Sequence, residues 1–248
     1  MKDDFKNFIF SADKIVGKSK PIIANEKNNK INIYWGVKVS NQLNINIIFF
    51  INKLMELQKF NCNIIILIAD IHTLIDSSFS FKDSEINSFI AKLEKALSLI
   101  KLKDNNEIKL IKGSQFQLDK TYILDVFKLI SFYNISELCQ EFDLDIKDSS
   151  FKEILHPLLQ CLDEEYINKT KNIDIDCQIG YNHQHKYYVF NKKISEKMNF
   201  KKRLYVLFDI PIQLINDPMP LYYNQNFFIY YLKKFDKQTL KFIQNIFI

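Results

Sequence analysis

One apolar run limits the possible folds of this chain more than any other part of its sequence. Residues 61–70 read NCNIIILIAD, a nearly continuous β-branched segment. A strand with one wet face alternates apolar and polar residues, whereas a parallel strand that helices cover on both faces is apolar throughout. The run therefore predicts a buried strand of a parallel sheet.

Segments of strand and helix periodicity alternate around that run. Short strands are predicted at residues 30–36 and 107–113, and helices with apolar residues at helical spacing are predicted at residues 45–60 and 84–100. Such alternation is typical of an α/β fold, in which ligands bind beyond the carboxyl ends of the strands. Asp70 and His72 lie at such an end.

The second half of the chain is predicted to be mostly helical. This pattern runs from residue 118 to about residue 194, and one more buried strand is predicted in residues 203–212. Within this half, the segment ILHPLLQCLDEEY places His156, Gln160 and Asp163 at positions i, i+4 and i+7, on one helix face. The spacing is compatible with a solvated stripe and with the wall of a pocket.

Composition narrows the possible functions. The four cysteines contain no CxxC pair, so neither a disulfide framework nor a thiolate zinc site is indicated. With only four glycines, any nucleotide site must do without a glycine-rich phosphate loop. The net charge of +5 is compatible with a polyanionic partner without requiring one. The acidic start MKDDFKNF and the absence of a long apolar run predict a cytoplasmic chain with no membrane partner.

Longer motifs are more specific. The chain contains, in this order, the blocks IYWG, IADIHTLID, IKGSQFQLDKTYILDVFKL and HPLLQCLDEEY, the last followed by DIDCQIGYNHQHK. In order and approximate spacing, they resemble the catalytic domain of eukaryotic and archaeal-type tyrosyl-tRNA synthetases, from about residue 31 to about residue 210. The resemblance implies a class I aminoacyl-tRNA synthetase fold, which is a Rossmann-like parallel sheet flanked by helices. It also implies a homodimer interface that includes residues 113–130.

The same resemblance predicts how the chain is divided. Residues 31–216 are expected to form the synthetase-like domain, with a helical insertion at about residues 113–150. Residues 1–30 are expected to be an N-terminal extension. Residues 217–248 are expected to form an amphipathic helical tail that either packs on the body or docks a partner. No anticodon-binding domain is expected.

The resemblance assigns roles to the polar residues of a tyrosine pocket. It implies that Asp163 and Tyr34 bind the phenol oxygen of tyrosine, that Gln160 faces the amino group, and that Gln178 belongs to the same pocket. His156 stands where the family has a tyrosine. A pocket that needs a hydroxyl rejects phenylalanine, because its own polar groups would stay unpaired. With two further residues that match the family, the predicted set is Tyr34, Asp70, His72, His156, Gln160, Asp163 and Gln178.

The nucleotide side departs from the family. The positions that match the HIGH-type signature are Asn44, Ile45, Asn46 and Ile47. The histidine and the glycine of that signature are missing, and Asn46 has a side chain where adenine would need bare backbone. The family's GGxDQ block begins at Gly180, where Tyr181 replaces the second glycine and His183 the aspartate. No KMSKS-type motif follows the last strand. Loss of one preorganised donor costs about 3 kcal/mol of transition-state stabilisation, so no catalytic residue is assigned.

Two classes of function remain open. The first is a catalytically inactive tyrosyl-tRNA synthetase-like protein that acts as an RNA-binding, ribosome-binding or scaffold factor, or that binds tyrosine without activating it. Its expected partners are RNA, the ribosome, or a synthetase-like subunit in a homodimer or heterodimer. The second is a divergent active tyrosine–tRNA ligase that uses ATP and Mg²⁺.

Basic residues offer one surface for RNA. The set is Lys192, Lys193, Lys197, Lys201, Lys202 and Arg203. Such clusters contact phosphates, although a solvated surface gives the same pattern. His183 and His185 lack the carboxylate or thiol neighbours of a metal site, so no metal is predicted. For the inactive protein, no cofactor is predicted either.

Overall fold

The computed structural model describes most of the chain up to residue 209. The described ranges are residues 4–25, 29–40, 43–57, 60–75, 82–98, 100–102 and 105–209. The predicted tail at residues 217–248 lies outside them, as do the last residues of the predicted synthetase-like domain.

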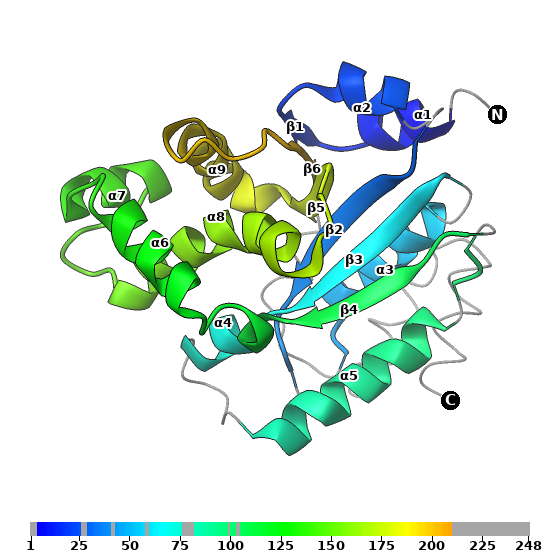
Figure 1. The fold of residues 1–248 in the computed structure, drawn as a ribbon, viewed down its shortest axis with the longest axis horizontal. Coiled ribbons are helices and arrows are strands. Elements are labelled where there is room, and N and C mark those ends of the chain that lie inside the picture. The colour runs from blue at the N-terminus through cyan, green and yellow to red at the C-terminus, as the bar shows by residue number, and fades with distance from the viewer. Residues whose placement is uncertain are drawn as a thin grey trace, which may run out of the picture.

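A six-stranded sheet forms the centre of the molecule (Figure 1). The strands are β1 (Lys14–Val16), β2 (Ile31–Val37), β3 (Cys62–Ile68), β4 (Ile108–Lys112), β5 (Cys177–Tyr181) and β6 (Leu204–Phe208). Their order is β1-β6-β5-β2-β3-β4, and all neighbours are parallel except β1, which is antiparallel to β6. From β2 the chain continues outward to β3 and β4, and later returns to form β5 on the other side of β2. The crevice between β2 and β5 is therefore the point at which the strand order reverses, where α/β sheets bind ligands.

Helices cover both faces of the sheet (Figure 1). The first face carries α1 (Asp4–Phe10), α3 (Ile45–Leu57) and α5 (Asp83–Leu97). The second face carries α6 (Lys120–Ile130), α7 (Ile135–Phe142), α8 (Phe151–Lys171) and α9 (His185–Lys197). The shorter elements are α2 (Ser19–Asn25), α4 (Asp70–Ile75), and the 3-10 turns η1 (Gly113–Gln115) and η2 (Asn182–Gln184).

The strand β3 confirms the prediction from the apolar run. Its Ile64 and Ile66 lie in the core beneath α3 and α5, whereas Ile65 and Leu67 lie in the core beneath α6 to α9. Because successive side chains of a strand point to opposite faces, a strand that helices cover on both faces is apolar on both, as β3 is from Ile64 to Ile68. The predicted α/β fold, a parallel sheet flanked by helices, is confirmed.

One central strand is wrong in the sequence-based prediction. Residues 177–181 were expected to belong to a helical region, but they form β5, which lies between β2 and β6. Five residues are too few to show a period, and the helix α9 begins four residues later. Backbone pairing with its two neighbours stabilises the strand. In the pairing with β2, Tyr34 lies opposite Gln178.

Residues 4–25 share the core and the sheet with the residues that follow them. Phe5, Phe8 and Ile9 of α1 are buried in the first core, and the ring centroid of Phe8 lies 5.6 Å from that of Phe208. The strand β1 extends the sheet beyond β6. The segment that the sequence suggested as an extension therefore contributes both core side chains and an edge strand.

None of the helices in the described ranges is long and apolar enough to cross a membrane. The predicted insertion at about residues 113–150 contains η1, α6 and α7.

Candidate functional site

A pocket of about 450 Å³ opens at the carboxyl ends of β2 and β5. Its walls come from the carboxyl-terminal parts of those two strands, from the start of α3, from His72 of α4, and from one face of α8. It lies at the crevice where the strand order reverses, as the topology predicts.

One wall of the pocket is the polar face of α8. His156, Gln160 and Asp163 all line the pocket, so the ladder seen in the sequence is a pocket wall and not a solvated stripe. The helix is well defined at its start, where Ser150 and Glu153 form a capping box.

Asp163 is the centre of a buried hydrogen-bond cluster. The side chain is 1% exposed. Its Oδ2 lies 2.9 Å from Nε2 of His72, and its Oδ1 accepts from Nε2 of Gln117 at 2.6 Å and from the hydroxyl of Tyr122 at 2.8 Å. A carboxylate offers about four acceptor positions, and the described residues fill three of them, so one position on Oδ2 remains for a ligand.

Tyr34 faces the same end of the pocket from β2. Burial, and next the charge of Asp163, raise the pKa of Tyr34 well above its usual value. The phenol therefore stays neutral and can both donate and accept a hydrogen bond. A neutral phenol beside an acceptor carboxylate is an arrangement that can bind a hydroxyl.

A second polar group of the pocket is Gln178 on β5. Its Nε2 donates to the hydroxyl of Tyr188 at 3.1 Å, and that hydroxyl lies 3.3 Å from Oε1 of Gln184. The Oε1 of Gln178 is buried, and no group among the described residues donates to it. Buried acceptors are normally paired, so this carbonyl is available to a ligand.

Asp70 does not belong to the pocket wall, in contrast to the expectation from the sequence. Its Oδ1 accepts from the backbone N–H groups of Ser114 at 2.9 Å and of Ile71 at 3.0 Å. The carboxylate thus fixes the turn η1 beside Gly113. His72, two residues later, is the residue of this pair that lines the pocket.

On the nucleotide side of the pocket, a side chain of the protein itself caps the start of α3. The Oδ1 of Asn44 accepts from the backbone N–H of Ile47 at 3.1 Å, which uses an amide at the start of α3 that would otherwise be free for an anion. Asn46 and Ile47 also line the pocket, whereas the side chain of Ile45 lies outside the described part of the chain.

Aromatic side chains pack against one another beside that helix start. The ring of Tyr181 meets the ring of Phe50 edge-on at 4.5 Å and lies parallel to the ring of His183 at 5.2 Å. Phe50 in turn stacks on Trp35 at 5.3 Å. With a capped helix start and a tyrosine where a glycine is needed, the residues present do not fit the ATP site that the resemblance implies.

Comparison with known proteins identifies the family. The model of the family "tRNA synthetases class I (W and Y)" matches residues 26–226. The chain belongs to this family of class I synthetases. Within the family, it is a domain like the catalytic domain of tyrosyl-tRNA synthetases.

Relatives that match the chain include tyrosine–tRNA ligases. The probable cytoplasmic enzyme of Enterocytozoon bieneusi is 27% identical over 78% of this chain and 56% of its own length. The cytoplasmic enzyme of Gallus gallus is 25% identical over 78% of this chain and 36% of its own length. The chain thus spans about half the length of the first of these relatives, and less of the second.

Solved structures share the fold. Tyrosyl-tRNA synthetase of Archaeoglobus fulgidus, complexed with L-tyrosine, has a TM-score of 0.67 at 22% identity and covers 84% of this chain and 65% of its own. The enzyme of Aeropyrum pernix has a TM-score of 0.69 at 17% identity, with 84% and 61% covered.

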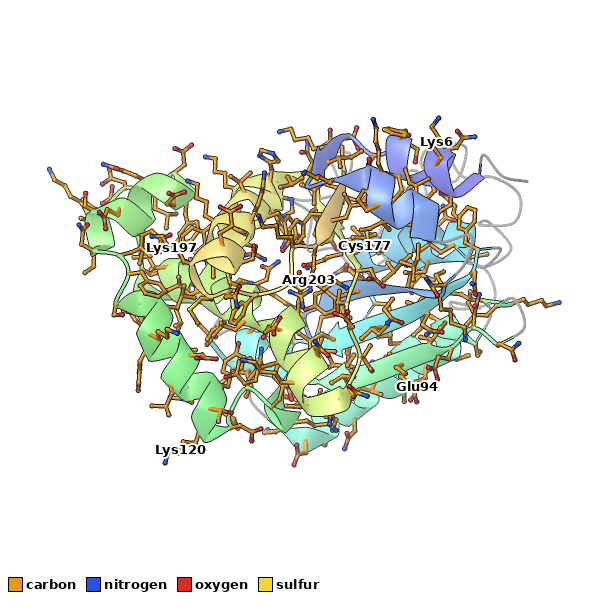
Figure 2. All side chains as sticks on the ribbon, turned by 45° about the horizontal axis from the view of Figure 1, so that its top comes forward. Lys6, Glu94, Lys120, Cys177, Lys197 and Arg203 are labelled. Atoms are coloured by element: carbon orange, nitrogen blue, oxygen red, sulfur yellow. The ribbon has the colours of Figure 1, made fainter. Side chains whose placement is uncertain are left out.

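Arg203 of this synthetase-like domain is not at the surface, so its inclusion in the RNA-facing set is wrong. The side chain is 6% exposed, whereas Lys120, which lies at the edge of the molecule in Figure 2, and Lys197 are exposed. Its Nη2 donates to Glu165 at 3.0 Å, and its Nε lies 3.5 Å from Glu164. The physical reason is the acidic pair that follows Asp163 on α8, which draws the guanidinium into the core.

The lysines of the same set are largely engaged within the chain. Lys201 binds Asp174 and Asp176, both at 2.8 Å. The remaining contacts are Lys193 to Glu141, Lys202 to Glu196, and Lys197 over the ring of Tyr133. Lys192 is exposed. The patch is therefore less positive than the sequence suggests.

Three polar residues of the site were missed by sequence reasoning. Gln117, Tyr122 and Tyr188 complete the clusters around Asp163 and Gln178. Gln117 and Tyr122 fall within a block that resembles the family, and this was the available signal. Among the residues that the structure describes, no three His, Cys, Asp or Glu side chains gather as metal ligands.

Proposed function

We propose that this chain is a tyrosyl-tRNA synthetase-like domain that binds tyrosine, or a closely similar phenolic amino acid, without activating it. The observation that carries this proposal is the cluster around Asp163, in which three donors of the chain leave one acceptor position free at the buried end of the pocket. Such a position has a use only if a ligand brings a hydrogen-bond donor to it.

The cluster also supports discrimination against phenylalanine. Phenylalanine would place a C–H beside the Asp163 carboxylate and beside the hydroxyl of Tyr34. A buried polar site that loses its partner rejects the analogue by a factor of about 10⁴. Binding of tyrosine with rejection of phenylalanine is therefore the expected behaviour.

Two features support a lack of activation by ATP. Asn44 takes up an amide at the start of α3, and Tyr181 packs against Phe50 where a second glycine would leave room. Each missing donor costs about 3 kcal/mol in the transition state. The expected role is then a binding or scaffold factor, located in the cytoplasm as the named relatives are.

The test is calorimetric titration of the full chain with tyrosine and with phenylalanine. We expect heat with tyrosine only, and we expect Tyr34→Phe to weaken tyrosine binding at least tenfold, because one hydroxyl is removed from the pocket. The matched control is Tyr205→Phe, because the hydroxyl of Tyr205 contacts Glu164 and does not line the pocket. Equal heats for the two amino acids, or none for tyrosine, would refute the proposal.

The active ligase is the second candidate, and family membership is the observation that favours it. It predicts tyrosine-dependent exchange of pyrophosphate into ATP by the purified chain. Exchange that disappears in Asp163→Ala would establish a rebuilt activation site, since a contaminating host enzyme would be unaffected by the substitution. We expect no exchange.

An RNA or ribosome partner is a further part of the proposed role. The charges that remain for it are few, because most lysines of the predicted patch have acidic or aromatic partners in the chain. Co-sedimentation with ribosomes and with tRNA over a salt series tests it, because phosphate contacts weaken steeply with salt. Association that does not respond to salt, or no association, would count against an RNA-binding role.

A further inference from the structure

Along β4, the sheet ends in an edge that no described strand covers. β4 is the last strand in the strand order, and within the described part of the chain its backbone pairs with β3 on one side only. Figure 1 shows it as the outermost strand on that side of the sheet. An edge strand presents a row of unpaired N–H and C=O groups to which another extended chain can bind. The edge of β4 is therefore a candidate interaction surface.

The register identifies the backbone groups that point outward. The N–H of Ile64 on β3 donates to the carbonyl oxygen of Glu107 at 2.9 Å, and successive residues of a strand direct their backbone groups to opposite edges. The odd-numbered residues of β4 therefore face β3. Ile108, Leu110 and Lys112 face outward, and no described residue pairs with their backbone N–H and C=O groups. Each of the three offers one donor and one acceptor.

A second pocket, of about 360 Å³, lies beside the same strand. Ile111 and Ile173 give it apolar walls, and the exposed Lys109 and Lys171 also line it. None of the described residues that line it carries a carboxylate. Lys109 is paired with Glu107 at 2.9 Å, but both side chains are about half exposed, and such pairs contribute little. The lysine can therefore exchange this partner for a carboxylate of a ligand.

The two faces of β4 differ in character. Ile108 and Leu110 pack against the core beneath α3 and α5, whereas Ile111 belongs to the core beneath α6 to α9. Lys109 shares the face of Ile111, because side chains two residues apart point the same way. A strand added beside β4 follows the same alternation. Its side chains would meet apolar neighbours on the first face, and Lys109 with the second pocket on the other.

We propose that the edge of β4 binds an extended acidic segment of a partner protein, which adds a strand to the sheet. The segment has apolar residues at every second position and glutamates between them, and one glutamate carboxylate lies between Lys109 and Lys171. Backbone hydrogen bonds supply affinity in this mode of recognition, and alternate side chains supply specificity. A second copy of the chain fits this edge less well, because lysines on an edge strand oppose pairing with their own kind. The surface is separate from the pocket at β2 and β5, so it does not depend on the proposed function.

The state of the edge is tested by hydrogen exchange of the backbone amides, followed by NMR on the full chain without a partner. We expect the amides of Ile108, Leu110 and Lys112 to exchange at least tenfold faster than those of Lys109 and Ile111, since only the latter two are bonded to β3. Equally slow exchange in both groups would show that another part of the chain, or a second copy, covers the edge. That result would overturn the proposal.

Binding is tested by fluorescence anisotropy with the labelled synthetic peptide acetyl-TVEVEVT-amide and its counterpart acetyl-TVKVKVT-amide. We expect the acidic peptide to bind about tenfold more tightly, and to slow the exchange of the three outward amides. Equal affinities for the two peptides, or no binding of the acidic one, would overturn the proposal. A third peptide, acetyl-TVEPEVT-amide, keeps both glutamates but lacks the central N–H. If it binds as tightly as the first, the attraction is one of charge alone and strand addition is wrong.

The position of the carboxylate is tested by reversing one charge. We expect Lys171→Glu to weaken the acidic peptide about tenfold and to strengthen the lysine peptide, because the preferred charge is exchanged. Lys171 is exposed at the end of α8, so the substitution is expected to leave the fold intact. The matched control is Lys192→Glu on α9, which should change neither affinity. The same affinities in Lys171→Glu as in wild type would show that the second pocket does not hold the glutamate.

Discussion

Gly180 leaves no room for any side chain next to the pocket. A Cβ built on it would lie 2.2 Å from the hydroxyl of Tyr188 and 2.8 Å from the ring carbon that bears it. The close approach lets this hydroxyl reach Gln178. At the residue scale, the glycine thus determines where the amide of Gln178 points.

Gly180→Ala is expected to displace Tyr188 and to reduce the free energy of unfolding by about 1 to 3 kcal/mol, as other overpacked sites do. Urea denaturation measures the change. The matched control is Gly36→Ala, whose Cβ would meet the end of the Tyr34 side chain at 3.2 Å and nothing closer. Equal losses in the two variants would show that the contact with Tyr188 is not tight.

The sequence located some site residues and misplaced others for a physical reason. His156, Gln160 and Asp163 lie on one helix, so their spacing alone put them on one face. Gln117 and Tyr122 reach Asp163 from other elements, and no spacing rule relates them to it.

Charged residues were misplaced because sequence does not distinguish a buried pair from a surface pair. Asp70 holds the backbone of Ser114, and Arg203 holds Glu165, both inside the molecule. Each charge is compensated by a partner distant in sequence, so its burial became visible only in three dimensions.

The helix α8 connects the pocket to the sheet, because the residue after Asp163 contacts a strand of the sheet. Glu164 is buried, with its Oε2 3.3 Å from the hydroxyl of Tyr205 on β6. Burial raises the pKa of Glu164 from 4.5 to about 7, although the nearby Arg203 guanidinium opposes the shift. Between these pH values the native state holds a proton that the unfolded state has lost, so stability falls as the pH rises.

Glu164→Gln removes this titration. We expect the free energy of unfolding of the variant, relative to wild type, to rise by about 2 to 3 kcal/mol between pH 5 and pH 8. Taking the difference between the two proteins cancels the opposite contribution of histidines such as His156, whose pKa is lowered by burial. Urea titrations at four pH values provide the measurement, and a difference independent of pH would mean that Glu164 is ionised in the native state throughout.

The first helix can be tested as part of the core. Phe8 on α1 is 5% exposed and its ring contacts the rings of Phe60 and Phe208, whereas Phe10 on the same helix is 56% exposed. Phe8→Ala is expected to lower the free energy of unfolding by about 3 kcal/mol or more. Phe10→Ala is the control and should change it by less than about 0.5 kcal/mol. If both substitutions changed the free energy of unfolding by a similar small amount, α1 would not be part of the core.

Long, uniformly patterned helices and strands could be predicted from the sequence, whereas short ones could not. The strand β3 and the helix α5 carry long uniform patterns and were predicted. The strand β5 has five residues, and it is identified only by its pairing with β2 and β6. The short strand β1 likewise depends on pairing with β6, since three residues carry no pattern.

For the whole molecule, the reversal of strand order explains why both helical layers contribute to one site. Tyr34 and Trp35 are neighbours on β2, yet they point into different cores and both line the pocket. The layer of α8 supplies the polar residues for an amino acid, and the layer of α3 has become aromatic through Phe50 and Tyr181. Substitutions in the layer of α3 can therefore abolish the binding of the nucleotide while the layer of α8 still binds the amino acid.

The outer surface of α6 suggests how whole molecules associate. Leu118, Leu124 and Phe127 are large, apolar and exposed, and they lie in the segment for which the family resemblance implies a homodimer interface. We expect a dimer in sedimentation analysis at micromolar concentration and a monomer for Phe127→Asp, because a charge would be buried at a twofold interface. Phe151→Asp is the matched control, since Phe151 is 68% exposed at the start of α8 and outside that segment. A wild-type monomer, or dissociation by both substitutions alike, would argue against an interface at α6.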